Sequence, residues 1–118
     1  MPSRAPLPKH LKPKIRELAG LAYERDLGAG LAKLEARFTE WRAQKLSPFE
    51  LNQLIHEFHD GISRDLYKQY VTGEAEWAVA VALDVGLLSD AEVGTELMQQ
   101  LQWRLDWLRR DDSEGESD

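Results

Sequence analysis

Two of the three histidines in the chain, His56 and His59, lie three residues apart in a segment with helical character. In a helix this spacing places both imidazoles on neighbouring positions of one face. Ser63, Tyr67 and Tyr70 continue along the same face if the helix is regular. We call these five residues the imidazole–tyrosine row. Their side chains are the strongest candidates in the chain for metal binding or catalysis.

The row could support a metal-binding or hydrolytic helical-bundle enzyme centred on His56 and His59. Histidines at i and i+3 can share a metal ion, and Asp60 lies one turn from His56. An imidazole also titrates near pH 6.5, which suits general acid–base catalysis, and Ser63 is one turn from His59. Two reaction chemistries are therefore conceivable at the same positions.

The metal and catalytic motifs of helical enzymes are incomplete here. Di-iron bundles use Glu-x-x-His pairs, but no glutamate of this chain is followed by histidine three residues later. The metalloprotease pattern His-Glu-x-x-His fails because His59 comes one residue too early. The sequence therefore assigns no catalytic residue, no metal ligand and no cofactor. It favours histidines that hydrogen-bond a neighbouring helix, or a row that binds a protein partner through Tyr67 and Tyr70.

A second unusual surface is formed by tryptophans. Trp103 and Trp107 are an i, i+4 pair on nearly the opposite side of their helix from the leucine stripe Leu97, Leu101, Leu105 and Leu108. Either both rings are internal, because the helix is flanked on two sides, or they form a dimer seam or partner site. Trp103 and Trp107 therefore join the row as candidate partner-binding residues.

Composition limits the classes of protein to consider. The chain has 118 residues, enough for one domain, and a net charge of −6, which argues against a nucleic-acid partner. It has no cysteine, so disulfides and thiolate zinc sites are excluded, as fits a reducing compartment such as a bacterial cytoplasm. Residues 1–20 lack the apolar core of a signal peptide, and the longest apolar run, residues 77–83, is too short to span a membrane.

The first helical segment, about residues 13–45, follows a flexible proline-rich lead-in over residues 1–9. Its apolar residues form two stripes on roughly opposite faces, with glycines at 20, 28 and 30 near the switch. Either this helix kinks or breaks near residues 20–30, or it is long and buries different faces against different partners. The second arrangement favours a dimer.

The later helix boundaries are marked by two capping boxes. Ser47-Pro48-Phe49-Glu50 opens a helix that should end at Thr72-Gly73, and Ser89-Asp90-Ala91-Glu92 opens one over about 90–110. Residues 74–87 have both helical and strand character; we assign a central helix, because a lone strand would have no partner. Residues 111–118 carry five carboxylates and no apolar residue, which predicts a disordered acidic tail.

The sequence thus predicts an all-α protein, with a single domain over residues 10–110 folded as a compact bundle of four principal helices. We expect a small, acidic, non-enzymatic cytoplasmic interaction or regulatory protein of the antitoxin, immunity or adaptor type. It would bind a protein partner, or itself as a homodimer, through aromatic helix faces. The alternative is the metal-binding or hydrolytic enzyme described above.

Overall fold

The computed structural model describes residues 6–116, with side chains described for residues 6–110. Every regular element in this part of the chain is helical, which confirms the all-α prediction. A short 3₁₀ turn, η1 (Lys9–Leu11), leads into α1 (Lys12–Arg42), and Pro13 lies in the first turn of α1, where its missing N–H costs nothing. The helix α1 is long and continuous, so of the two alternatives that the sequence left open, the long helix is found and the break near residues 20–30 is not.

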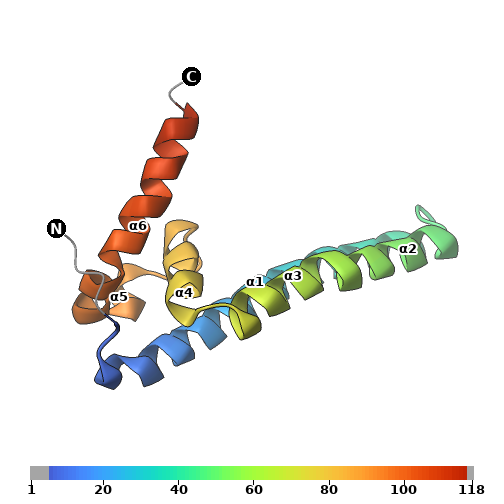
Figure 1. The fold of residues 1–118 in the computed structure, drawn as a ribbon. Coiled ribbons are helices and arrows are strands. Elements are labelled where there is room, and N and C mark those ends of the chain that lie inside the picture. Colours follow the sequence, from blue (N-terminus) through green and yellow to red (C-terminus); the bar gives the residue numbers. More distant parts are fainter. Residues whose placement is uncertain (1–5, 117–118) are drawn as a thin grey trace.

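The second helical rod runs back along α1 in four consecutive pieces. It consists of α2 (Pro48–Phe58), the π-helical turn η2 (His59–Ser63), α3 (Arg64–Tyr67) and a second π-helical turn η3 (Lys68–Thr72). The predicted capping box opens it: the Glu50 N–H donates to Ser47 Oγ at 3.1 Å, and the Ser47 N–H donates to Glu50 Oε1 at 3.4 Å. Together α1 and this rod form a long helical hairpin (Figure 1).

The remaining helices pack at the N-terminal end of α1. The segment of mixed character forms α4 (Ala75–Asp84), as predicted, and five of its ten residues are buried. The second capping box opens α5 (Asp90–Val93). The chain then turns at Gly94, whose φ of 88° lies in the left-handed region that favours glycine. The single helix predicted over 90–110 is therefore wrong at this point, and α6 (Thr95–Glu116) begins after the turn.

The helix α6 also continues past its expected end near Arg110. It runs to Glu116, although the side chains beyond Arg110 lie outside the described ones. The expected disorder of the 111–118 tail stays a prediction.

The hydrophobic core sits where α1, α4 and α6 meet. Its largest fully buried side chains include Leu97, Leu101 and Leu105 of α6 and Val79 of α4. The N-terminal stripe of α1 (Ile15, Leu18, Ala19 and Ala22) enters this core. Further along the chain α1 contacts α2. The second stripe of α1 is divided: Tyr23 and Leu27 pack against the core, whereas Leu31 and Trp41 stay exposed.

The packing is less compact than expected. A compact domain of this length has a radius of gyration of about 13.5 Å, whereas the chain has 17.9 Å and extents of 57 × 40 × 24 Å. Figure 1 shows two reasons: the far half of the hairpin projects away from α4, α5 and α6, and the C-terminal part of α6 extends beyond α4 and α5. We call the projecting part of the hairpin, residues 27–62, the arm.

Candidate protein-binding site

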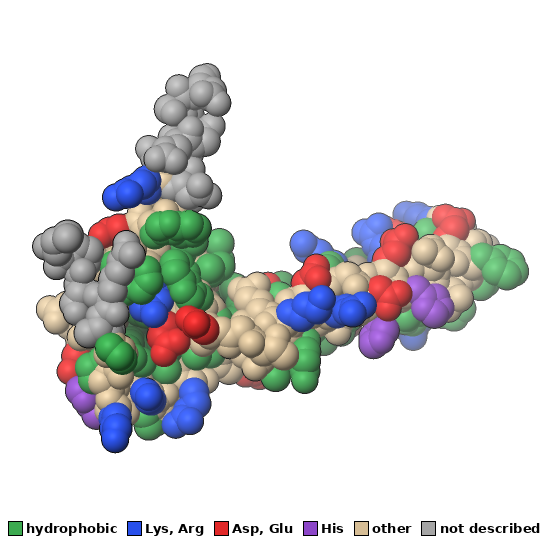
Figure 2. Space-filling view, in the orientation of Figure 1, with side chains coloured by type: hydrophobic (Ala, Val, Ile, Leu, Met, Phe, Trp, Pro, Cys, Tyr) green, Lys and Arg blue, Asp and Glu red, His purple; other side chains and the backbone are tan. Residues whose placement is uncertain are grey.

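The arm consists of two helices, so each helix can cover only one face of the other. Leu51 is the one large apolar side chain buried within it; Leu34, Phe38, Leu54 and Phe58 are half-buried, and Leu31 and Ile62 are exposed by 48% and 45%. At the tip of the arm, Phe49 is 87% exposed. Figure 2 shows apolar side chains on the surface along the arm and at its end. The arm therefore exposes apolar area that no other part of the described chain covers.

The close approach of the two helices depends on Gly30. A Cβ atom at this position would lie 3.2 Å from Phe58 Cε2 and 3.3 Å from Ile62 Cγ2, tighter than most contacts of real Cβ atoms. Gly28, two residues earlier, has no atom within 4 Å of its Cβ position. A glycine inside a helix is unfavourable by itself, so Gly30 is explained by the space that Phe58 and Ile62 occupy.

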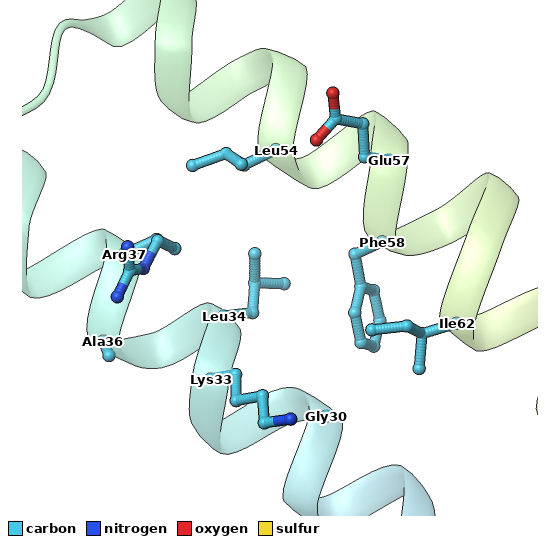
Figure 3. Close-up of a pocket in the computed structure, with 9 residues that line it drawn as sticks. All are labelled: Gly30, Lys33, Leu34, Ala36, Arg37, Leu54, Glu57, Phe58 and Ile62. Atoms are coloured by element: carbon cyan, nitrogen blue, oxygen red, sulfur yellow. The ribbon is translucent and has the colours of Figure 1, made fainter. Parts of the chain in front are cut away.

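Beside this contact lies an open groove of about 430 Å³. Figure 3 shows Leu34 from α1, with Leu54 and Phe58 from α2, directed into the space between the helices. Lys33 and Arg37 lie on its α1 side and Glu57 on its α2 side. We call these residues, with Gly30, Ala36 and Ile62, the arm groove. It has an apolar floor and charges of opposite sign on its two rims.

The structure brings three members of the predicted row together. His59, Ser63 and Tyr67 line a shallow pocket of about 370 Å³, with Tyr23 from α1 across from them, and Asp60 and Arg64 complete the lining. The three residues are spaced by four. At 3.6 residues per turn each step of four drifts by about 40°, but a π turn holds more residues, since its hydrogen bonds span i to i+5. The η2 turn therefore keeps all three on one face.

His56 does not join this pocket. It lies on the last turn of α2 and is exposed. His59 in η2 and Tyr67 in α3 are exposed as well. Within the described residues no hydrogen bond joins His59 to Ser63, and no group of three or more His, Asp or Glu side chains could hold a metal ion. His10, the third histidine, pairs with Glu96 of α6 at 2.7 Å.

Tyr70, predicted to bind a partner, leaves the row and enters the core, where only 9% of it is exposed. Its ring stacks on Tyr23, with centroids 5.2 Å apart, and its hydroxyl donates a hydrogen bond to Asp26 Oδ2 at 3.1 Å. Burial and the Asp26 carboxylate raise the pKa of Tyr70 above its ordinary value. The physical reason for the change of face is again the π turns: Phe58, Ile62, Leu66 and Tyr70 recur every four residues and stay aligned toward α1.

The tryptophan pair has a third member that the sequence pattern did not reveal. Trp77 of α4 makes edge contacts with Trp103 at 5.5 Å and Trp107 at 5.6 Å between ring centroids. Trp103 is half-buried, whereas Trp107 remains 52% exposed. Trp103 is thus mainly internal, whereas Trp107 stays on the surface, and its contact with a partner stays a prediction.

Arg104 fills the space among these rings. Its guanidinium lies 4.4 Å from the centroid of Trp103 and 5.5 Å from that of Trp77, close enough for cation–π attraction. Burial lowers the pKa of Arg104, and its Nε is buried without a hydrogen-bond acceptor among the described atoms. The contacts among these rings and Arg104 therefore join α4 to α6. Arg109, further along α6, lies 3.8 Å from Asp84.

The arm groove was not predicted as a site. Leu54, Phe58 and Ile62 have the spacing of ordinary core residues, and a sequence does not state that only one neighbouring helix will cover them. A glycine at position 30 inside a long helix was the available clue to a close helix contact.

Comparison with known proteins identifies no relative: no family model matches the chain, and neither the curated proteins nor the solved structures provide a match. Among the described helices, none combines the length and the apolar character needed to cross a bilayer.

Proposed function

We propose that this chain is a non-enzymatic interaction protein whose arm binds a protein, either a different chain or a second copy of itself. The observation that carries the proposal is the arm groove, an apolar floor between α1 and α2 that stays open beside charged rims. Apolar area removed from water at such a surface is stabilising by about 25 cal/mol per Å². An apolar, concave surface of this kind suits the side chains of an incoming helix.

The surface area of the chain supports the same proposal. It exposes 8336 Å², whereas a compact monomer of 13.5 kDa exposes about 6,500 Å². The difference, roughly 1,800 Å², covers the whole chain, including α6 and the side chains outside the described ones, and the arm supplies part of it. Its size is that which a standard protein–protein interface buries in total. A long arm with an open apolar side exposes apolar surface to water when the chain is alone. A partner that covers the arm would remove this surface from water.

Exposed aromatic side chains outside the groove extend this proposal. Tyr67, beside the pocket of His59 and Ser63, and Trp107, at the edge of the tryptophan cluster, keep about half of their surface open. Tyrosine and tryptophan are the residues that most often anchor interfaces, since each buries a large ring and offers a polar atom. Both remain candidate contacts for a partner, while Tyr70 and most of Trp103 serve the fold.

A photo-crosslinking experiment tests the proposal. The photoreactive residue p-benzoylphenylalanine replaces Ile62 in the arm groove, and in a matched variant it replaces Ala32, which is exposed on α1 and does not line the groove. In the organism that encodes the chain, the Ile62 variant should give a discrete crosslinked species, and the Ala32 variant should not. Mass spectrometry then identifies the partner.

The identified pair is next tested with purified proteins. Leu54→Glu and Ile62→Glu should each weaken binding at least tenfold, because a carboxylate would be desolvated on the apolar floor. Phe49→Ser, at the tip and outside the groove, serves as the control and should leave affinity within a factor of about three. Equal crosslinking at positions 62 and 32, or unchanged affinity of both glutamate variants, would show that the groove is not a binding surface.

A further inference from the structure

Resting on the proposed function, we infer that the partner of the arm groove is a second copy of the same chain, and that two arms pack face to face as an antiparallel four-helix bundle. Two-helix hairpins are incomplete units, and four-helix bundles are the arrangement in which all of their apolar stripes are covered. A second identical arm supplies a surface of the same length and the same apolar width.

The rims of the groove select how the two copies are oriented. A two-fold axis that runs along the length of the arm places α1 of one copy over α2 of the other at the same level. Lys33 and Arg37 of each copy then face Glu57 of the other. Each ion pair forms twice, so the interface is self-complementary.

The other face-to-face arrangement is disfavoured by the same charges. An axis across the arm would place α1 over α1, with Lys33 and Arg37 opposite their own counterparts, and like charges at an interface are strongly unfavourable. Within one chain, Arg37 already pairs with Glu40 at 3.1 Å, and Gln53 donates to Glu57 at 3.4 Å. These exposed contacts are weak and can be shared with a second copy.

The excess surface agrees with a dimer of this kind. Two copies each have roughly 1,800 Å² more surface than a compact chain, and a standard interface needs about 800 Å² from each partner. Less than half of the excess therefore has to be covered for a stable dimer.

Charge reversal gives a sharp test on the purified full chain. Variant A carries Lys33→Glu and Arg37→Glu, and variant B carries Glu57→Lys; all of these side chains are exposed, so folding should be retained by circular dichroism. Light scattering after size exclusion should give twice the chain mass of 13.5 kDa for the wild type. Each variant alone should dimerise at least tenfold more weakly, because its rims carry like charges.

Mixing the two variants should restore the dimer, because each rim of A then meets an opposite charge on B. A triple variant with all three reversals should also dimerise, because opposite charges again face each other across the interface. With an axis across the arm, the reversed charges would still face like charges, so this variant would not dimerise. Restoration in both cases supports the inference, since a merely destabilised fold could not be rescued by a second damaged chain. Failure of either rescue overturns it.

The distance between the tips of the two arms shows the direction of the two-fold axis of the dimer. The chain has no cysteine, so Ala43→Cys gives one attachment point for pyrene. In this arrangement the two α1 tips are parallel and lie diagonally across the bundle, about 11–14 Å apart for a helix spacing of about 8–10 Å. Pyrenes at this separation should give excimer emission, and monomer emission from a dimeric sample would overturn the orientation. A wild type that is monomeric at all concentrations would overturn the inference of a second copy, while a crosslink from position 62 to a different protein would still uphold the proposed function.

Discussion

The hydroxyl of Tyr70 donates a hydrogen bond to Asp26 at 3.1 Å, and this contact joins η3 to the middle of α1. It lies at the base of the arm, where the hairpin enters the core of α1, α4 and α6. Tyr23, one turn before Asp26, stacks on the ring of Tyr70 with an interplanar angle of 11°. The base of the arm is thus fixed by one polar bond and one ring contact.

Replacing Tyr70 by phenylalanine should test this contact. The ring stack remains, but Asp26 loses its donor, so we expect the free energy of unfolding to fall by about 1–2 kcal/mol. Tyr67→Phe is the control, because that ring is half exposed and its change should stay within about 0.5 kcal/mol. Urea denaturation measures both, and equal effects would contradict the role of the Tyr70–Asp26 bond.

Alkaline titration offers an independent check on Tyr70. Its pKa is raised in the folded chain, mainly by burial, so the neutral hydroxyl is the form that the fold favours. The associated stability is present below the ordinary tyrosine pKa of about 10 and is lost as the pH rises above it. Absorbance at 295 nm should show that Tyr70 ionises at a higher pH in the folded chain than in urea, and this delayed ionisation should be absent from Tyr70→Phe.

Acid should weaken the contact between α1 and α5. Arg25 forms a two-pronged pair with Glu92, with distances of 3.0 and 2.6 Å, and also donates to the carbonyl of Leu87 at 2.7 Å. The hydrogen bond from Arg25, helped by the Ser89 N–H, lowers the pKa of Glu92 to about 2. A lowered pKa contributes stability that is present above the unfolded value of about 4.3 and is lost as the pH falls toward the folded value.

Glu92→Gln isolates this effect. The stability difference between wild type and variant should be constant above pH 5 and should shrink as the pH falls from about 4.5 to 2. Glu17→Gln is the control, since that carboxylate is exposed near the start of α1. Chemical denaturation across this pH range gives the profile; a difference that does not depend on pH would mean that the pair contributes no charge-linked stability.

Two glycines of α1 allow a matched comparison. Gly28→Ala should stabilise the chain by about 0.5–1 kcal/mol, because alanine is the better helix former and its Cβ meets no atom. Gly30→Ala gains the same propensity but crowds Phe58 and Ile62, and crowding in a packed contact costs about 1–3 kcal/mol. We therefore expect Gly30→Ala to be less stable than Gly28→Ala by at least about 1 kcal/mol in thermal or urea unfolding. Equal stabilisation would show that the arm helices can separate freely at this point.

Much of the fold was predictable because local chemistry fixes helix ends. The two capping boxes, at Ser47 and Ser89, form the expected reciprocal hydrogen bonds. The phase change in the first segment left two alternatives, a broken helix or a long one with different partners. The long helix is found, and it contacts both α4 and α2 of the same chain. The strand-like alternation of residues 74–87 was correctly rejected, since a helix that is apolar nearly all round is what a central position requires.

The candidate site was harder to predict, for a geometrical reason. Converting sequence spacing to angles assumes 100° per residue, and under that assumption Tyr70 lies beside His59 rather than in the core. The two π turns break the assumption, and the only trace in the sequence is the repeated spacing of four from Phe58 to Tyr70. The open groove depends on which helices cover α2. The helix α4 packs on α1 and α6 packs on α4, away from the arm, and local patterns do not encode that placement.

The tryptophan cluster provides the last prediction. Trp77 lies between the rings of Trp103 and Trp107, so its loss should remove two edge contacts, whereas loss of Trp107 removes one and uncovers little. We expect Trp77→Ala to cost about 2–4 kcal/mol and Trp107→Ala about 1 kcal/mol, with a coupling energy of about 0.5–1.5 kcal/mol in the double-mutant cycle. A cycle of Trp77 with Trp41, near the far end of α1, should give no coupling. If the pair with Trp107 also shows none, then the exposed indole makes no stabilising contact with α4, and Trp107 would be held in place only by its own helix.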